Sequence, residues 1–370
     1  MRVLAAGGGS GGHVTPALAI LEVLAANDPH LEICFVCDKK FAPQVRTILA
    51  GSSLPITLKI VHAGKFRRYH DVSMWRQLID VQTHLLNLRD LIFIVMGFWQ
   101  SWRIIRRFKP QAVFTKGGFV CLPVGIAAHL ARLPLIIHES DTHAGLTNRI
   151  LGKWATVIAT GAPLENYQYD RSRAHYVGIP VSAGFTPVTP REQMSIKQQL
   201  TSDAQRSLVV VVGGGLGATR INQAMVRLSK QLIKEDIEII HVAGAANGDA
   251  VQAEIAAQLS EDERSYYHVR PFVDATEMAL LLQAADVVVS RAGATAVAEL
   301  AALHKASILI PSAVLTGGHQ VKNAKLYESA RAALLVNEAD LRKNPVVLAK
   351  AILWITKNAK LIPSASTPIC

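Results

Sequence analysis

The sequence predicts an α/β protein with two Rossmann-like domains, whose parallel sheets face each other across a cleft. Residues 3–6 and residues 208–212 each form an apolar run, typical of a buried strand, that leads into a glycine-rich loop and then a helical pattern. The 370 residues, 50% hydrophobic and 18% charged, are enough for two cores. Glycine and proline recur through residues 161–190, as expected of a linker.

These observations give four expected segments. Residues 1–163 form the first domain, 164–190 the linker and 191–343 the second domain, and the helical segment 344–370 is expected to cross back to the first domain. The chain starts directly with a strand, so we expect no signal peptide.

The first glycine-rich loop, residues 7–12, ends at His13. Thr15 and Pro16 favour a helix that is capped by the threonine and starts at the proline. A helix N-terminus after such a loop suits a phosphate group, although no Gly-Lys-Ser/Thr of a Walker A motif follows. Asp38 is the nearest acidic residue for a dinucleotide fingerprint, so an oxidoreductase remains an alternative.

His13 is the candidate general base. An imidazole with an ordinary pKa near 6.5 is suited to removing a proton at neutral pH. The alternative is that His13 only caps or packs against the loop.

Residues 85–109 predict one long helix with an apolar middle at 91–99 and a basic end. Nine apolar residues are too few to span a bilayer, so we expect no transmembrane helix. The segment is either a core helix or lies at a membrane interface, with its arginines on lipid phosphates.

Polar residues follow two further strands of the first domain. Lys116-Gly117-Gly118 comes after the strand at 112–115, and His138-Glu139 ends the strand at 134–137. The carboxyl ends of parallel strands are where α/β sheets bind ligands, so these residues are candidate ligand contacts.

In the second domain, residues 285–324 contain two buried strands and a small-residue turn opening a helix. Such a turn predicts a nucleoside-diphosphate pocket, with Glu299 on the ribose hydroxyls. The alternative is an ordinary crossover whose Glu299 is merely solvated.

The net charge of +11 lies mostly in the first domain. Residues 1–163 hold 18 Lys and Arg against 9 Asp and Glu, a net of +9, which leaves +2 for the rest. This predicts an anionic partner, and without interleaved aromatic and basic residues we expect no nucleic acid. Cys34 and Cys37 fall in one strand on opposite faces, so we expect buried, unpaired thiols.

Several motifs occur in order along nearly the whole chain. They are the loop ending in Gly11-Gly12-His13, residues 64–69 (Gly-Lys-Phe-Arg-Arg-Tyr), residues 116–120, 138–139, 144–148, 213–218, 286–294, Glu299 and 319–324. This set resembles the MurG family of peptidoglycan glycosyltransferases, in glycosyltransferase family 28. The resemblance implies a GT-B fold and inverting transfer of N-acetylglucosamine from UDP to the 4-hydroxyl of N-acetylmuramic acid in undecaprenyl-diphosphate-linked lipid I, forming lipid II.

The resemblance also implies the roles of individual residues, with His13 as the catalytic base. The implied donor contacts are Ser10, Gly11, Gly12, Asp141, Ser182, Gly215, Val273, Ala294, Thr295, Ala296, Val297, Ala298, Glu299 and Gln320. The implied acceptor contacts are Gly8, Gly9, Gly117, Gly118, His138 and Asn148.

No cofactor or metal is implied, because UDP-N-acetylglucosamine is itself a substrate. The implied partners are this donor, lipid I, an anionic membrane surface and other cell-wall synthesis enzymes. The implied location is the cytoplasmic face of the cell membrane, as a peripheral protein.

The chain departs from the family pattern at four positions. Ile179 replaces a small polar residue, Ser182 an arginine, Asp141 an asparagine and Gly215 a serine. These departures keep two alternatives open: a related enzyme, either a glycosyltransferase with another acceptor or a UDP-sugar epimerase, and a weakly catalytic scaffold that binds lipid intermediates.

Overall fold

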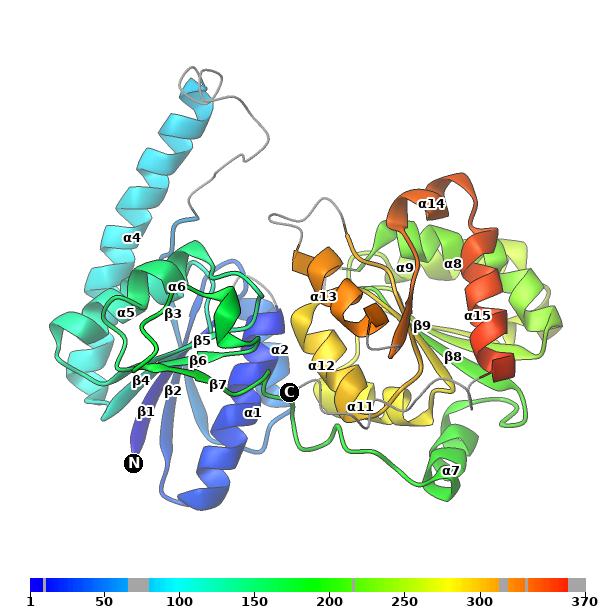
Figure 1. Cartoon of the computed structure of the whole chain (residues 1–370), viewed down its shortest axis with the longest axis horizontal. Coiled ribbons are helices and arrows are strands. Elements are labelled where there is room, and N and C mark those ends of the chain that lie inside the picture. The colour runs from blue at the N-terminus through cyan, green and yellow to red at the C-terminus, as the bar shows by residue number, and fades with distance from the viewer. Residues whose placement is uncertain (9–10, 66–79, 215–216, 313–318, 330–331, 359–370) are drawn as a thin grey trace. The chain divides into compact units, whose positions relative to one another are not determined.

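The computed structural model describes residues 1–8, 11–65, 80–214, 217–312, 319–329 and 332–358. Its contacts divide the chain into two compact units, Met1–Pro180 and Val181–Cys370. Each unit has a central parallel sheet with helices on both faces (Figure 1). The predicted class of two Rossmann-like α/β domains is therefore confirmed.

In the described part of the first unit, seven strands pair in parallel in the order β3-β2-β1-β4-β5-β6-β7. The elements are β1 Arg2–Ala6, α1 Gly11–Asn27, β2 Glu32–Asp38, α2 Ala42–Ala50, β3 Ile56–Val61, α4 Val81–Phe108, β4 Ala112–Thr115, α5 Cys121–Leu130, β5 Leu135–Glu139, α6 Leu146–Leu151, β6 Val157–Thr160, the 3₁₀ turn η1 Leu164–Asn166, and β7 Ala174–Tyr176.

Alternate residues of the first sheet enter different cores. Val3 packs with α1 and α2 on one face, whereas Leu4 packs with α4 and α5 on the other. Cys34 and Cys37 are buried on these opposite faces as free thiols, so the predicted separation of the pair is confirmed.

One predicted boundary in the first unit is wrong. Helix α1 begins at Gly11, so Thr15 and Pro16 lie inside the helix and neither starts it. The helix tolerates Pro16 because the proline lies near its start and removes only the bond that would reach the Gly12 carbonyl. His13 consequently lies in the first turn of α1. The predicted long helix is confirmed as α4.

In the described part of the second unit, six strands pair in parallel in the order β10-β9-β8-β11-β12-β13. The elements are α7 Pro190–Leu200, β8 Ser207–Val212, α8 Thr219–Lys234, β9 Ile237–Val242, α9 Gly248–Gln258, α10 Glu261–Arg264, β10 Tyr267–Arg270, α11 Ala275–Ala284, β11 Val287–Ser290, α12 Ala294–Ala302, β12 Ser307–Leu309, α13 His319–Ser329, β13 Ala333–Leu335, α14 Glu338–Lys343 and α15 Val346–Asn358.

The expected linker is shorter than 164–190. Residues 174–176 form β7, which pairs with β6 as part of the first sheet. On the other side, the Gln283 amide donates to the carbonyls of Gly184 (3.1 Å) and Thr186 (3.0 Å), which ties that stretch to the second unit. The local composition of glycine and proline could not show these long-range bonds.

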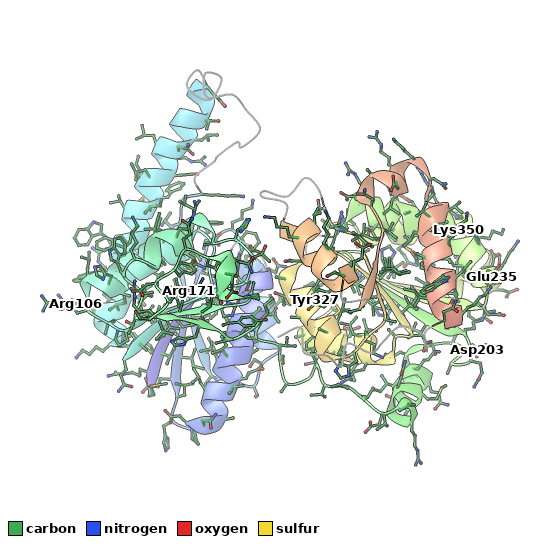
Figure 2. The ribbon with its side chains drawn as sticks, in the orientation of Figure 1. Arg106, Arg171, Asp203, Glu235, Tyr327 and Lys350 are labelled. Carbon is green, nitrogen blue, oxygen red and sulfur yellow. The ribbon has the colours of Figure 1, made fainter. Side chains whose placement is uncertain are left out.

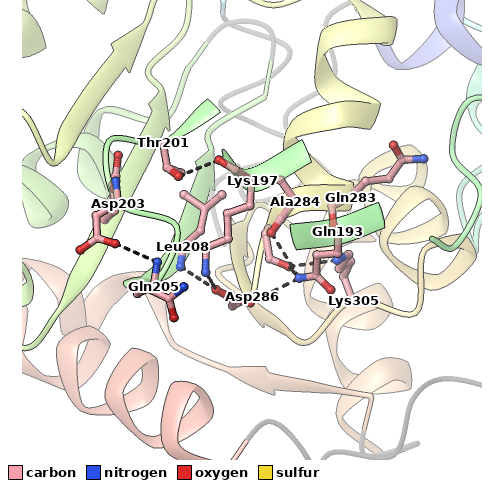
Figure 3. Close-up of polar contacts among 12 residues, drawn as sticks. Gln193, Lys197, Thr201, Asp203, Gln205, Leu208, Gln283, Ala284, Asp286 and Lys305 are labelled. Atoms are coloured by element: carbon pink, nitrogen blue, oxygen red, sulfur yellow. Dashed lines mark hydrogen bonds and ion pairs between the residues drawn. The ribbon is translucent and has the colours of Figure 1, made fainter. Parts of the chain in front are cut away.

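Helix α7 is fastened to the second sheet through Asp286, which directly precedes β11 (Figure 3). Lys197 Nζ and the backbone N–H of Leu208 both donate to Asp286 Oδ2, each at 2.7 Å. Gln193 Nε2 donates to the carbonyl of Ala285 at 3.0 Å. These bonds hold α7 against the sheet of the second unit.

The C-terminal helix does not follow the expectation for residues 344–370. Leu348, Ala349, Ile352 and Ile355 of α15 enter the core of the second unit, beside α8 and β11. These apolar residues recur at helical spacing, so α15 buries its stripe against its own domain. Residues 359–370 lie outside the described part of the chain.

Candidate functional site

A pocket lies at the carboxyl edge of the first sheet. Its volume is about 320 Å³, and it is formed by segments that follow β1, β3, β4 and β5. Its lining residues are Gly8, His13, Gly64, Lys65, Gly117, Gly118, Phe119, Leu122, Glu139, Asp141, Gly145, Leu146, Thr147 and Asn148. The structure thus brings together His13 and four predicted acceptor contacts, Gly8, Gly117, Gly118 and Asn148, although they are far apart in sequence.

Two glycines let the loops of this pocket approach each other. Gly117 and Gly118 have φ angles of 100° and 86°, which residues other than glycine rarely adopt. A Cβ on Gly118 would lie 2.4 Å from the carbonyl oxygen of Gly8. A Cβ on Gly117 would lie 3.6 Å from His13 Nδ1 and 3.4 Å from Asn148 Nδ2. The backbone at Gly117 is therefore flanked by the imidazole and the amide.

His13 is neutral in this environment. Burial of the ring lowers its pKa to about 4 and the charge of Lys116 lowers it further, whereas the charge of Asp141 and, to a smaller extent, an interaction with the Lys116 backbone raise it. Its Nδ1 is buried and has no hydrogen-bond partner among the described residues. The position in the first turn of α1 also disfavours the cation, because that end of the helix dipole is positive.

Lys116 is a cation beneath the pocket, with only 1% of the residue exposed. Its Nζ donates to the Ser140 hydroxyl, and burial lowers its pKa to about 8 while Glu139 and Asp141 raise it. It therefore remains charged at neutral pH. The sequence analysis gave Lys116 no separate role, although its place between a buried strand and two glycines is a detectable signal.

Glu139 organises the loop after β5. Its Oε1 accepts from the Asp141 backbone N–H at 3.1 Å, and its Oε2 accepts from the Gly145 N–H at 2.8 Å and Asn148 Nδ2 at 3.1 Å. Burial raises the pKa of the Glu139 carboxyl to about 7, and the charge of Asp141 also raises it. With both oxygens engaged, Glu139 acts as the anchor of the loop.

Asp141 was predicted as a donor contact, and the structure places it in this pocket beside His13. Its backbone is held on both sides, by Glu139 at the N–H and by the Tyr167 hydroxyl, which donates to its carbonyl at 2.7 Å. Tyr167 was missed by the sequence analysis because it lies in the stretch interpreted as linker.

His138 and Asn148 differ in what they can offer a ligand. The His138 Nε2 donates to the Gly178 carbonyl at 2.9 Å, and burial lowers the pKa of its ring to about 3. His138 was predicted to contact the acceptor substrate, but it does not line the pocket and its ring bonds to the Gly178 carbonyl instead. Asn148 does line it, and its Oδ1 is buried without a partner among the described residues.

The second unit offers a helix N-terminus at the carboxyl edge of its sheet. Gly293 precedes α12, caps it without a side chain, and has open space where a Cβ would lie. Ala294, Thr295, Ala296 and Ala298 are half-buried along this helix. Free backbone N–H groups and small residues suit a diphosphate.

Glu299 is half-buried in the second turn of α12. Burial raises the pKa of its carboxyl to about 8, and no described residue donates a hydrogen bond to it. A carboxyl that is desolvated but unpaired is a candidate for binding ligand hydroxyl groups.

Glu338 and Arg291 support this edge and were not assigned roles from the sequence. Glu338 is buried and pairs with Arg291 and with Arg220, the latter at 3.0 Å. The Arg291 guanidinium also donates to the Ile310 carbonyl at 3.2 Å. The network links the ends of β11 and β12 to α8 and α14, and so fixes the turn that opens α12.

The remaining predicted contacts are those to the donor and Gly9, which was predicted to contact the acceptor. Gln320 lies next to this edge, where its Oε1 accepts from the Ser312 N–H at 2.9 Å. Val273 and Val297 are buried in the core, and Ser182 is half-buried near the start of the second unit. Gly11 and Gly12 are the first residues of α1, whereas Gly9, Ser10 and Gly215 lie outside the described residues.

Two searches covered the described residues only. No cluster of histidine, cysteine, aspartate or glutamate there has the arrangement of a metal site. None of the described helices has the length and apolar character needed to cross a membrane.

Comparison with known proteins defines the class of this chain. It is similar to the crystal structure of Acinetobacter baumannii MurG, with a TM-score of 0.65 and 25% identity, covering 98% of this chain and 93% of that one. The Neisseria meningitidis UDP-GlcNAc 2-epimerase bound to UDP-GlcNAc has a TM-score of 0.60 at 11% identity, over 99% and 94% of the two chains, which shows a shared fold alone. Together with the two parallel α/β sheets, these neighbours define the GT-B class.

The family follows from sequence. The Glycosyltransferase family 28 N-terminal domain matches residues 3–160, and the corresponding C-terminal domain matches residues 208–367. The UDP-N-acetylglucosamine--N-acetylmuramyl-(pentapeptide) pyrophosphoryl-undecaprenol N-acetylglucosamine transferase of Alkaliphilus metalliredigens is 31% identical, over 94% of this chain and 89% of that protein. The transferase of that name from Bacillus cytotoxicus is 32% identical, over 92% and 87%. The chain belongs to glycosyltransferase family 28.

Proposed function

We propose that this chain transfers N-acetylglucosamine from UDP to the 4-hydroxyl of N-acetylmuramic acid in lipid I, with inversion, to form lipid II. The observation that carries the proposal is the composition of the first unit's pocket. It combines a neutral imidazole, two carboxyl groups and an amide oxygen without a partner, from His13, Glu139, Asp141 and Asn148. His13 can take the proton of a sugar hydroxyl and Asn148 can bind the sugar, as the reaction named for the relatives requires, while Glu139 anchors the loop that carries Asp141 and Asn148.

The second unit supplies what a UDP-sugar donor needs. The N-terminus of α12 presents backbone donors to a diphosphate, and Glu299 presents a carboxyl to the ribose. When the bond between the anomeric carbon and the diphosphate breaks, negative charge grows on the departing UDP. Fixed N–H groups at that helix end stabilise the charge, so the proposed transfer uses no obligatory metal or cofactor.

The exposed surface of helix α4 supports the proposal that the protein meets its acceptor at a membrane surface. The helix extends beyond the sheet of the first unit (Figure 1). Its exposed apolar side chains are spaced three or four residues apart and so share one face: Leu88, Leu91, Ile92, Val95, Met96 and Trp99. Ile92 and Trp99 are each 54% exposed.

Basic residues continue this face toward the C-terminal end of α4. Arg103 and Arg106 are both exposed there, and Arg106 lies at the outer surface of the unit (Figure 2). Each arginine near an anionic surface contributes about 1 kcal/mol to binding. The arrangement supports peripheral attachment to the cytoplasmic face of a membrane, where lipid I would be reached.

The reaction is tested by incubating the protein with labelled UDP-N-acetylglucosamine and a short-chain lipid I analogue, in detergent with EDTA. A disaccharide product establishes donor, acceptor and metal independence together. If UDP binds but no product forms, the acceptor differs or the chain is a scaffold. Formation of UDP-N-acetylmannosamine, or of N-acetylmannosamine and UDP if water also cleaves the bond to UDP, would instead indicate an epimerase.

The membrane contact has a matched control within the chain. Trp99 on α4 and Trp354 on α15 are both exposed helical tryptophans, at 54% and 48%. We expect Trp99→Glu to weaken binding to anionic phosphatidylglycerol vesicles by at least about tenfold, because it places a charge in the apolar stripe, and Trp354→Glu to leave binding unchanged. Equal effects in a vesicle sedimentation assay would refute the assignment to α4.

A further inference from the structure

Asp141 has an unusual position for a carboxylate in a pocket that is proposed to receive a diphosphate-linked acceptor. Its backbone is clamped at the N–H by Glu139 Oε1 (3.1 Å) and at the carbonyl by the Tyr167 hydroxyl (2.7 Å). The clamp keeps the half-buried side chain at the pocket wall, which it shares with His13. None of the described residues donates a hydrogen bond to its carboxylate. The structure thus holds a free acceptor group in place.

His13 alone is poorly suited to hold a proton here. The ring is desolvated, sits in the first turn of α1, and lies near the charged Lys116. Its Nδ1 has no described partner that would stabilise the cation. A base whose protonated form is so disfavoured gives slow proton removal unless a negative charge compensates.

Two carboxyl groups are near enough to act, and their surroundings assign them different tasks. Glu139 accepts three hydrogen bonds, from two backbone N–H groups and the Asn148 amide, so its oxygens are occupied. Asp141 is unoccupied, and its negative charge favours protonated His13. Among the described residues, the other charged groups around the pocket are Lys116 and Lys65, both cationic, so Asp141 is the described group that can offset a new positive charge.

We propose that Asp141 is the electrostatic partner of His13, stabilising the positive charge that the imidazole acquires when it takes the proton of the acceptor hydroxyl. This inference rests on the proposed function and deepens it. As the acceptor oxygen bonds to the anomeric carbon, its proton passes to His13, and the bond from that carbon to the diphosphate breaks with its electron pair leaving on UDP. The imidazolium then returns the proton to water. Asp141 is a positioning residue in this step and exchanges no proton.

Asparagine has nearly the same shape as aspartate, so Asp141→Asn removes the negative charge with little change in packing. We expect kcat to fall on the order of 10–100-fold with KM for the lipid I analogue within about twofold, since charge stabilisation of a base acts on the chemical step. Asp141→Glu should recover part of the loss. Asp249→Asn, an exposed aspartate in the first turn of α9, is the matched control and should retain full activity.

The pairing also has a readout that needs no turnover. In ¹⁵N-histidine spectra recorded against pH, with the His13 signal assigned by His13→Gln, the pKa of His13 should be lower in Asp141→Asn than in the wild-type chain. If wild-type protein shows no transfer, the proposed function fails, and the titration still decides whether the two residues are coupled. Full kcat in Asp141→Asn, a loss confined to KM, or an unchanged His13 titration would each overturn the inference.

Discussion

The two units use the same fold to build different kinds of site. In the first unit, the carboxyl edge of the sheet gathers His13, Lys116, Glu139 and Asp141, and charges within this set shift the pKa values of His13, Lys116 and Glu139. In the second unit, the corresponding edge offers a helix N-terminus and the carboxyl of Glu299, whose pKa is raised by burial alone. One site is a coupled set of side chains, and the other is mainly backbone.

This difference matches the tasks proposed for the two units. Removing a proton from a hydroxyl requires a base with tuned basicity, and tuning requires neighbouring charges. Holding a diphosphate requires fixed N–H groups, which backbone supplies without titrating. A change to one side chain should therefore alter the pKa values and positions of several groups in the first site, whereas in the second site it should affect only the contacts of that side chain.

The largest expected effect comes from removing the anchor of the first site. Glu139→Ala leaves three donors without their acceptor and removes one of the two carboxylates whose charges favour the buried Lys116 cation, so we expect the free energy of unfolding to fall by about 3–5 kcal/mol. Urea denaturation measures the loss. Glu165→Ala, at an exposed position on η1, is the control and should change stability by less than about 0.5 kcal/mol. A stable Glu139→Ala protein would show that the first site is not coupled as described.

The next test compares a glycine in the loop after β4 of the first unit with one in the loop after β8 of the second unit. Gly118 and Gly214 have similar φ angles, 86° and 84°, but only Gly118 faces another backbone atom, the Gly8 carbonyl oxygen. We expect Gly118→Ala to lower the free energy of unfolding by about 2–4 kcal/mol, from strain plus a clash, and Gly214→Ala by about 1 kcal/mol, from strain alone. If thermal unfolding shows that both variants lose the same stability, the loop that contains Gly118 is no more tightly packed than the loop that contains Gly214.

The sequence was sufficient to predict most of the fold. Buried β-branched strands, glycine-rich loops and a helix over residues 85–109 are local patterns, and the structure confirms them as two parallel sheets and α4. The thiols of Cys34 and Cys37 were placed correctly because strand periodicity is also local. The predicted start of α1 was wrong because the helix begins with glycines, and glycine has a low helix propensity.

The arrangement of the first site could not be predicted in the same way. The link from Lys116 to Ser140 depends on β4 lying beside β5, and the bond from Tyr167 to Asp141 depends on the supposed linker folding onto the first sheet. Contacts of this kind follow from strand order. The resemblance named six of the residues that line the pocket, but only the structure shows which of their atoms are occupied.

Glu299 gives the third prediction. Its carboxyl has a pKa raised to about 8, so the folded chain binds its proton more tightly than the unfolded chain. The associated stability is present below about pH 4.5 and is lost as the pH rises toward 8. We therefore expect Glu299→Gln to raise Tm relative to wild type more at pH 8 than at pH 5, while UDP affinity measured by calorimetry falls about tenfold. A variant that is no more stable at pH 8 would contradict the desolvation of this carboxyl.

The smallest effect is expected at Gly293 and isolates the contribution of the backbone. A Cβ there meets no atom of the chain, and the φ angle of −68° suits any residue, so Gly293→Ala should leave Tm unchanged. The same methyl group would occupy the space in front of the α12 N-terminus that the diphosphate is proposed to approach, so UDP affinity should fall severalfold without loss of stability. Unchanged UDP affinity in calorimetry would remove this helix end from the donor site. It would also leave Glu299 as the sole support for placing the nucleotide on the second unit.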